Sequence, residues 1–191
     1  MLMIHTTEPP VRRLTYQDYL RFPDDGTRHE LIDGMHLVTA TPSVRHQQIV
    51  RNLIFRLSQH LEQHGGGQLL HAPLGVVFTL YDVVQPDLLY VSDARKQILT
   101  ESVVRGAPDL VVEVLSPSTR KRDEGTKRTL YDRSDVVEYW IVDPASDSIR
   151  VYRRVKGRLA MTADLSRDTG DSLGSPLMPG LALPLDRIFS R

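Results

Sequence analysis

The chain has 191 residues and no cysteine, which excludes disulfides, thiolate-bound zinc and a cysteine nucleophile. Lysine plus arginine equals aspartate plus glutamate at 24 each, so the overall charge does not argue for a nucleic-acid partner. No apolar stretch approaches the roughly 20 residues of a membrane helix, and residues 1–10 lack the layout of a signal peptide. We expect a cytoplasmic protein with a flexible leader over residues 1–14 and one domain over residues 15–191.

The first part of this domain predicts a short helix, a hairpin and a long helix. In chain order, we expect a helix from Thr15 to Phe22, strands at His29–Asp33 and His36–Thr39, and a helix that follows Ser43. Asp-Gly between the two strands is a strong hairpin signal. Apolar residues recur every four positions in the long helix, and Gly65 is expected to end it.

The rest of the chain alternates strands with one more helix. We expect strands at Val76–Leu80, Asp87–Val91, Leu110–Leu115 and Val137–Val142, a helix at Arg120–Arg133, and a peripheral hairpin formed by Ile149–Val155 and Leu159–Ala163. The apolar residues of the tail are expected to pack on the domain. This order predicts an α/β fold in which a central mixed β-sheet is flanked by α-helices.

A carboxylate interrupts an apolar run at Glu113, within the strand expected at Leu110–Leu115. Burying a carboxylate is costly unless it is paired, hydrogen-bonded or bound to a metal ion. A structural ion pair with an arginine or lysine is therefore one interpretation of Glu113, and a metal site is the other. Oxygen ligands from two carboxylates, completed by waters, suit Mg²⁺ or Mn²⁺ rather than zinc.

A metal site needs a second carboxylate, and two Pro-Asp pairs offer one. Asp109 lies four residues before Glu113 on the same strand, about 13 Å away, which is too far to share an ion. Asp87 stands at the start of a different strand, which can pair beside the first. We therefore predict Asp87 and Glu113 as the metal ligands, and Asp109 as a solvated or capping residue.

A cation for phosphoryl charge is expected from the helix that follows the Glu113 strand. Lys127 shares one face of that helix with Lys121, Glu124, Arg128 and Tyr131. From this face Lys127 can reach the sheet and stabilise developing charge, while a solvated helix lysine is the alternative. Glu30 is a third acidic candidate, although its spacing alone favours an exposed strand residue.

Pro86-Asp87 followed by Glu113-Val114-Leu115 resembles the PD-(D/E)XK signature of restriction-endonuclease-like nucleases. A longer series is similar to one branch of these proteins, the Uma family. It comprises His29-Glu30-Leu31-Ile32-Asp33-Gly34, His46, Pro86-Asp87, residues 108–118, Asp123, Lys127, Tyr131 and residues 138–144. The resemblance extends from about Thr15 to Leu185.

The resemblance implies Mg²⁺-dependent hydrolysis of phosphodiester bonds, with Mn²⁺ as a substitute and DNA as the expected substrate, and it implies a homodimer. Asp87 and Glu113 would be metal ligands, and Glu30 would be an additional acidic residue of the catalytic site. Leu115 replaces the motif lysine, and Lys127 would take over its catalytic role. Asp135 stands where the family pattern has glycine, which indicates a turn residue.

Contacts to nucleic acid have two candidate locations. The segment Arg150–Arg158, read as a strand, places Arg150, Tyr152, Arg154 and Lys156 on one face, which suits phosphate contacts and base stacking. Charged residues also protect edge strands, so that interpretation stays open. Beside the expected site, the better candidates are Arg120, Lys121 and Arg122. His46 can face the site from the long helix, or lie on the helix surface.

Two classes of function follow from these residues. The first is an endonuclease in which Asp87 and Glu113 hold Mg²⁺ and Lys127 offsets charge in the transition state. The second is a catalytically inactive nuclease-fold module that binds DNA or assembles, and Leu115 favours it because the motif lysine is missing. A metal-dependent hydrolase of small phosphoesters is a third class.

Overall fold

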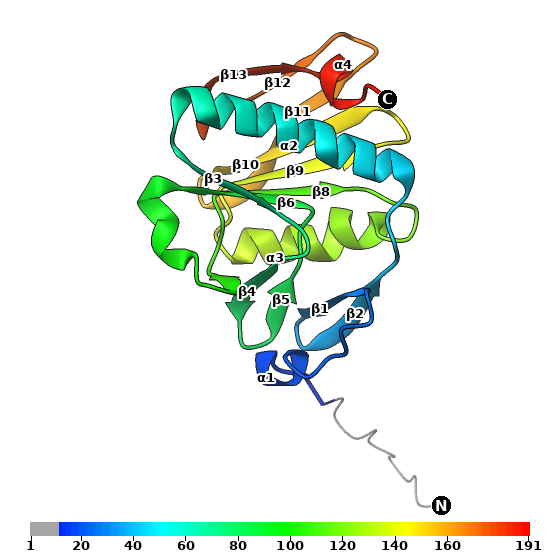
Figure 1. The fold of residues 1–191 in the computed structure, drawn as a ribbon, viewed down its shortest axis with the longest axis vertical. Coiled ribbons are helices and arrows are strands. Elements are labelled where there is room, and N and C mark those ends of the chain that lie inside the picture. The colour runs from blue at the N-terminus through cyan, green and yellow to red at the C-terminus, as the bar shows by residue number, and fades with distance from the viewer. Residues whose placement is uncertain (1–11) are drawn as a thin grey trace, which may run out of the picture.

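The computed structural model describes residues 12–191 and contains one large mixed sheet (Figure 1). Its six strands are, in spatial order, β11 (Arg158–Ser166), β10 (Ser148–Val155), β9 (Glu138–Asp143), β8 (Leu110–Val114), β6 (Leu88–Ser92) and β3 (Gly67–His71). Strands β8 and β9 run parallel, and the other neighbouring pairs are antiparallel. The predicted α/β class with a central mixed sheet is confirmed.

A second sheet lies beyond one edge of the helix that covers the large sheet, at the lower end of the view in Figure 1. Its order is β2 (Met35–Thr39), β1 (Arg28–Ile32), β5 (Asp82–Val84), β4 (Gly75–Thr79) and β7 (Val103–Arg105). The predicted hairpin of β1 and β2 is confirmed. Its turn residues Asp33 and Gly34 both have positive φ, at 54° and 76°, which is the geometry that Asp-Gly favours.

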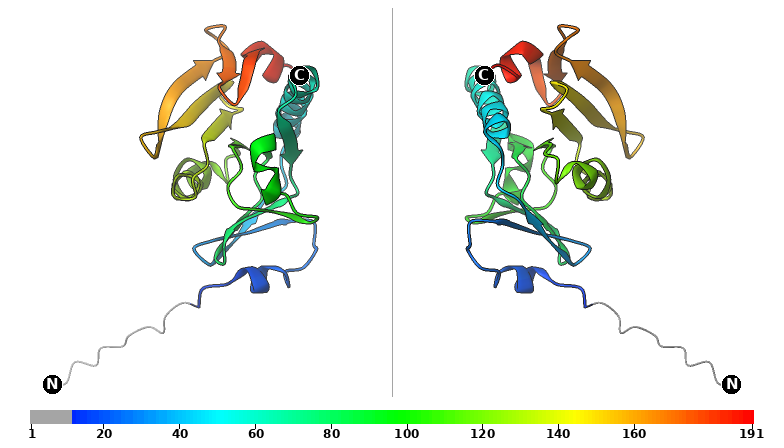
Figure 2. Two further views of the ribbon diagram at one scale, coloured as in Figure 1. Left: turned by 90° about the vertical axis from the view of Figure 1, so that its left-hand side faces the viewer. Right: turned by 90° about the vertical axis from the view of Figure 1, so that its right-hand side faces the viewer.

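Helices cover both faces of the large sheet, as Figure 2 shows from the side. On one face, α2 (Val44–His64) packs on Leu88, Leu110 and Val112 through the predicted apolar stripe. On the other face, the helix of residues 120–133 packs on the alternate residues of the same strands. Side chains alternate along each strand, so the odd-numbered positions of β8, Glu113 included, face this second helix.

The second helix changes its winding along its length. It consists of a π-helical segment, η2 (Arg122–Lys127), followed by α3 (Arg128–Arg133). The predicted helix at Arg120–Arg133 is confirmed, but periodicity did not predict the π segment. Such segments widen one turn of a helix and occur often at functional sites.

The remaining elements are short. They are α1 (Tyr16–Tyr19), the 3₁₀ helix η1 (Asp93–Ile98), strands β12 (Ser172–Ser175) and β13 (Met178–Pro184), and α4 (Leu185–Ile188). The tail packs on the α2 face of the core through Leu183, Leu185 and Ile188, as predicted. None of the helices in the described part of the chain is long and apolar enough to cross a membrane.

Several strands were not predicted. Strands β5 and β7 have three residues each, too few for an alternating pattern to emerge. Strand β3 begins at Gly67, inside a glycine run that is typical of a loop. Of the predicted leader, residues 1–11 lie outside the described residues. The Arg13 side chain and the Leu14 backbone N–H donate to the β1–β2 turn, at 2.8 Å each.

Candidate active site

The pairing of β6 with β8 determines where the two predicted metal ligands lie. Leu88 pairs with Val112, and continuing this antiparallel register by one residue places Asp87 opposite Glu113. Residues directly opposite each other point to the same face of a sheet. The Val114 N–H donates to Asp87 Oδ2 at 2.8 Å, which joins the two strands at this point. Both carboxylates are buried, with exposures of 3% and 4%.

Glu113 has two donors from the helix that faces it. Lys127 Nζ lies 2.9 Å from Glu113 Oε1, and the Tyr131 hydroxyl donates to the same oxygen at 2.6 Å. Lys127 is 2% exposed, so the alternative of a solvated helix lysine is wrong. Glu113 therefore has the lysine partner that a structural ion pair requires, and also the neighbouring Asp87 that a metal site requires.

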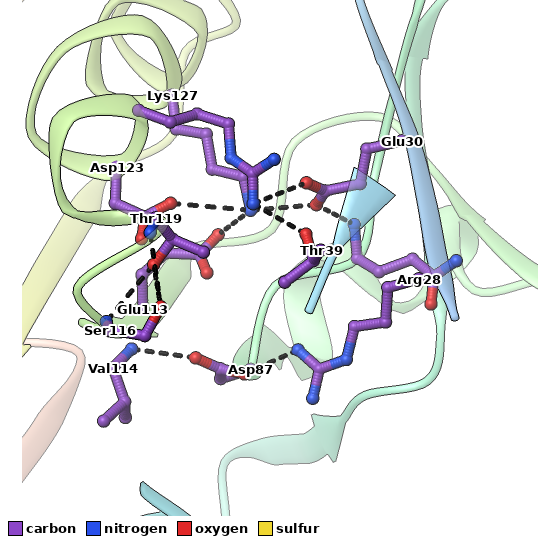
Figure 3. Close-up of polar contacts among 12 residues, drawn as sticks. Arg28, Glu30, Thr39, Asp87, Glu113, Val114, Ser116, Thr119, Asp123 and Lys127 are labelled. Carbon is purple, nitrogen blue, oxygen red and sulfur yellow. Dashed lines mark hydrogen bonds and ion pairs between the residues drawn. The ribbon is translucent and has the colours of Figure 1, made fainter. Parts of the chain in front are cut away.

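Glu30 joins this group from the other sheet. Its Oε1 lies 2.8 Å from Lys127 Nζ and accepts the Gln85 N–H at 2.8 Å. The expectation of an exposed strand residue is wrong, because Glu30 is 1% exposed. Strand β1 thus brings a carboxylate to the site through tertiary packing, which spacing along one strand cannot reveal. All four predicted residues lie together (Figure 3).

Asp87 is held by two side chains from different elements. Arg28 donates to its Oδ1 at 2.6 Å, and His46 Nε2 lies 3.1 Å from its Oδ2. His46 faces the site, as one of its two interpretations predicted. Arg28 was not predicted, although its position two residues before Glu30 places both on one face of β1, which is a usable signal.

The π-helical segment supplies two more residues. Asp123 is 2% exposed, and its Oδ1 lies 3.9 Å from Lys127 Nζ. Arg122 donates to the Thr39 hydroxyl at 2.6 Å and lies 3.8 Å from Glu30 Oε2. Asp123 was quoted in the family resemblance but was not predicted as a site residue. Its spacing of four from Lys127 is the signal that could have identified it.

Glu30, Asp87, Glu113 and Asp123 form what we call the acidic cluster. Burial raises the pKa of Glu113 to about 8 against the attraction of the Lys127 ammonium, and the other three carboxylates add to the rise. Burial also raises the pKa of Asp123. For Asp87 burial acts in the same direction, but His46 and Arg28 outweigh it and hold its pKa at about 2.

Comparison with known proteins places the chain in a family. The sequence profile of the Uma2 family, described as "Putative restriction endonuclease", matches residues 16–186. The chain belongs to this family. The resemblance deduced from the motifs is thereby confirmed.

Two relatives of this Uma2-family chain extend the comparison. An uncharacterized protein of Synechocystis sp., slr1290, is 28% identical over 156 residues, which cover 80% of each chain. A crystal structure from Anabaena variabilis, titled "a putative nuclease belonging to DUF820", superimposes with a TM-score of 0.77 at 18% identity. It covers 93% of this chain and 98% of that one, so the two share the restriction-endonuclease-like fold.

The acidic cluster of this Uma2 protein has features that fit a cation. Glu30 Oε2 and Asp123 Oδ1 are buried without a hydrogen-bond partner in the described part of the chain. The cluster surrounds a cavity of about 20 Å³, which has room for one water or ion. Within residues 12–191, no three His, Cys, Asp or Glu side chains form a metal site by themselves. The arrangement therefore fits two carboxylate ligands completed by water, as hard cations prefer.

Asp109, the second Pro-Asp residue, lies at the opposite end of β8 and does not join the site. Its Oδ2 accepts the Ser92 N–H at 2.8 Å, and Arg95 lies 3.4 Å from its Oδ1. Asp109 is 5% exposed. The prediction of a capping residue is confirmed, while its solvated alternative is wrong.

The predicted basic contacts are mostly engaged with the protein itself. Arg150 pairs with Glu124, and Arg154 donates to backbone carbonyls at the end of α3. The interpretation as an edge strand is wrong, because β10 lies between β9 and β11. Arg120 forms two bonds of 2.7 Å with Asp143, so of this basic group Arg122 is the residue that lines the cavity. Phosphate contact by the segment Arg150–Arg158 stays a prediction.

Asp135, the expected turn residue, has a φ of 62°. This left-handed conformation favours glycine but is tolerated by aspartate. The predicted turn before β9 is therefore confirmed.

Proposed function

We propose that this protein is a Mg²⁺-dependent endonuclease that hydrolyses phosphodiester bonds in DNA, with Mn²⁺ as a substitute. The observation that carries the proposal is the convergence of Asp87 and Glu113 across one strand pair, with Lys127 beside Glu113. Membership of the Uma2 family supports a nuclease. The Anabaena relative of the same fold is itself titled a nuclease. Location in the cytoplasm and assembly as a homodimer remain predictions.

Asp87 and Glu113 are the proposed metal ligands. A bound Mg²⁺ would polarise a phosphoryl oxygen and lower the pKa of a coordinated water. The protein's part is to keep both carboxylates ionised and aimed at one place. Arg28 and His46 orient Asp87, while Tyr131 fixes Glu113. These bonds order the ligands before any ion or substrate arrives.

Lys127 is the proposed replacement for the motif lysine that Leu115 lacks. Its ammonium carries three donors, and two of them are directed at Glu30 and Glu113. One donor is left for a phosphoryl oxygen at the mouth of the cavity. A charge placed there would stabilise the transition state more than the ground state, because negative charge on the phosphoryl oxygens increases as the bond breaks.

Cleavage assays test the proposal. Plasmid and single-stranded DNA are incubated with the purified chain and Mg²⁺, Mn²⁺ or EDTA, for wild type, Asp87→Asn and Glu113→Gln. The metal contributes several kcal/mol to transition-state stabilisation, so we expect each variant to lose about 100-fold or more in rate. Asp109→Asn is the matched control, because it changes the other Pro-Asp pair of the same strands and should retain full activity.

Metal binding provides a readout besides activity. Titration of Mn²⁺ followed by electron paramagnetic resonance should give one site in wild type and none in Asp87→Asn. DNA binding without metal-dependent cleavage would instead support the second candidate, an inactive nuclease-fold module, which Leu115 favours. Equal cleavage by wild type and both variants would refute the proposed site.

A further inference from the structure

A groove opens directly beside the candidate active site. It has a volume of about 650 Å³ and is formed by the outer face of α2 together with His71 and Ala72 at the end of β3. Arg28 and Asp87 line both this groove and the cavity of the acidic cluster. A molecule lying in the groove would therefore have one end at Asp87.

The groove follows one stripe of α2. Its lining residues there recur at helical spacing, and they include Gln47, Arg51, Phe55, Ser58 and Glu62. This stripe is separate from the one that faces the core through Ile49, Leu53 and Leu57. The 15 residues from Gln47 to Glu62 rise about 22 Å along the helix axis. The groove is thus long enough for several nucleotides.

The lining combines apolar surface with little charge. Phe55 is 58% exposed, and Ile54 and Val50 lie next to it on the same side of α2. Arg51 lies near the active-site end and has no carboxylate within 4.0 Å in residues 12–191, whereas Glu62 lies at the far end. A duplex is held by rows of phosphate contacts to lysine and arginine, and the groove does not offer such a row. Apolar and aromatic side chains instead suit the faces of unpaired bases.

We propose that this groove binds an unpaired nucleic-acid strand that leads to the scissile phosphodiester, so that the preferred substrate is single-stranded or splayed rather than intact duplex. This inference rests on the proposed function, because it takes the bond to be cleaved at Asp87. Phe55 stacks on a base, and Arg51 contacts a phosphate close to the site. The edge of β3 at His71 closes the other side.

Binding of a strand tests the groove separately from catalysis. Fluorescence anisotropy is measured with a labelled 15-nucleotide single strand and with its duplex, in EDTA to prevent cleavage. Wild type should bind the single strand more tightly than the duplex. Stacking of one base on an aromatic ring contributes about 1–3 kcal/mol, so Phe55→Ala should weaken single-strand binding about 5- to 150-fold. Arg51→Gln should weaken it less and reduce its dependence on salt.

A control variant keeps this comparison fair. Met161→Ala removes an apolar side chain that is 55% exposed, similar to Phe55. Met161 lies on β11, at the opposite edge of the sheet from β3. Met161→Ala should bind the strand as wild type does. Equal loss in both variants, or equal affinity for strand and duplex, would overturn the proposal.

Hydrolysis of a small diester separates the two proposals. Bis(p-nitrophenyl) phosphate can reach Asp87 and Glu113 without occupying the groove. Phe55→Ala should cleave it as wild type does, while losing activity on single-stranded DNA. Unchanged cleavage of both substrates would refute the groove and leave the proposed function in place. Strand binding through Phe55 without hydrolysis of either substrate would refute the nuclease and leave the groove.

A second copy of the chain is the competing occupant of the groove. Light scattering of wild type and Phe55→Arg decides between them. If wild type is a dimer that Phe55→Arg converts to a monomer, the groove is a subunit interface and the proposal is overturned. An unchanged mass for the two proteins supports the strand-binding groove.

Discussion

Strand β8 has an acidic residue at each end, and the two ends differ in how their charge is compensated. Asp109, just before the strand, has one backbone donor and one arginine, so both of its oxygens are matched. Glu113, next to the last residue, lies among three other buried carboxylates. Two oxygens of that acidic cluster have no hydrogen-bond partner in the part of the chain that the structure describes.

The difference shows that strand register, rather than the local motif, separates a structural aspartate from a candidate ligand. Pro86-Asp87 and Pro108-Asp109 are the same dipeptide, and each precedes a buried strand. Because β6 and β8 are antiparallel, the start of β6 lies beside the end of β8. Asp87 therefore meets Glu113, while Asp109 meets the end of β6 and the start of η1.

Removal of the lysine is expected to give the largest difference between the two ends. Lys127→Met leaves Glu30 and Glu113 buried without their shared cation, and breaking a buried pair in this way costs about 3–5 kcal/mol. Arg95→Met at the Asp109 end should cost less than about 1 kcal/mol, because its 3.4 Å pair is partly exposed. Urea unfolding of both variants measures the two free energies.

A double variant checks the cause of that loss. Adding Glu113→Gln to Lys127→Met removes one uncompensated charge, so part of the lost stability should return. If Lys127→Met is no less stable than Arg95→Met, the two ends do not differ in their electrostatics and the comparison fails.

A hydroxyl deletion gives the next largest effect. The Tyr131 hydroxyl donates to the Glu113 carboxylate, and a hydrogen bond to a charged group is worth about 1.5–3 kcal/mol. The Tyr139 hydroxyl donates at 3.1 Å to the backbone carbonyl of Asp123, a neutral acceptor worth about 0.5–1.5 kcal/mol. Tyr131→Phe should therefore lower the free energy of unfolding more than the matched Tyr139→Phe. Equal losses would show that Glu113 does not depend on this donor.

The sequence predicted the long-range order of the fold better than its short elements. Helix α2 and strands β6, β8 and β9 have strong periodic or continuous apolar patterns, and they lie within one or two residues of their predicted positions. The pair Asp87 and Glu113 followed from the same patterns, because strand length alone excluded Asp109. Strands β3, β5 and β7 carry no comparable pattern and appeared only in the folded chain.

The surroundings of the acidic cluster were less predictable, for a physical reason. Glu30 and Arg28 come from the second sheet, whose position depends on packing between sheets rather than on any spacing in the chain. Asp123 and Lys127 lie in the π-helical segment, where regular helical periodicity does not hold. Spacing at Lys127 predicted the correct helix, but it placed the exposed Arg128 on the same face as the buried Tyr131.

The smallest expected effect concerns a matched ion pair at the same end of the sheet as Glu113. Asp143 follows Val142, which pairs with Val114, and it accepts two bonds of 2.7 Å from Arg120. The hydrogen bonds from the Arg120 guanidinium lower the pKa of Asp143, although partial burial opposes them. A carboxylate whose pKa is lowered by folding stabilises the protein above its unfolded pKa of about 3.9, and this contribution is lost as the pH falls further.

Asp143→Asn should therefore be about 1 kcal/mol less stable than wild type at pH 7, since the Arg120 side chain is 38% exposed and solvent screens the pair. The difference should shrink below about pH 3.9 and vanish once the folded-state carboxyl is protonated. Urea unfolding between pH 2 and pH 7 measures it, with the exposed Asp168→Asn as a control that should show no such dependence. A difference that stayed constant with pH would mean that Asp143 stabilises by its shape and not its charge. The matched pair would then carry no electrostatic contrast with the acidic cluster.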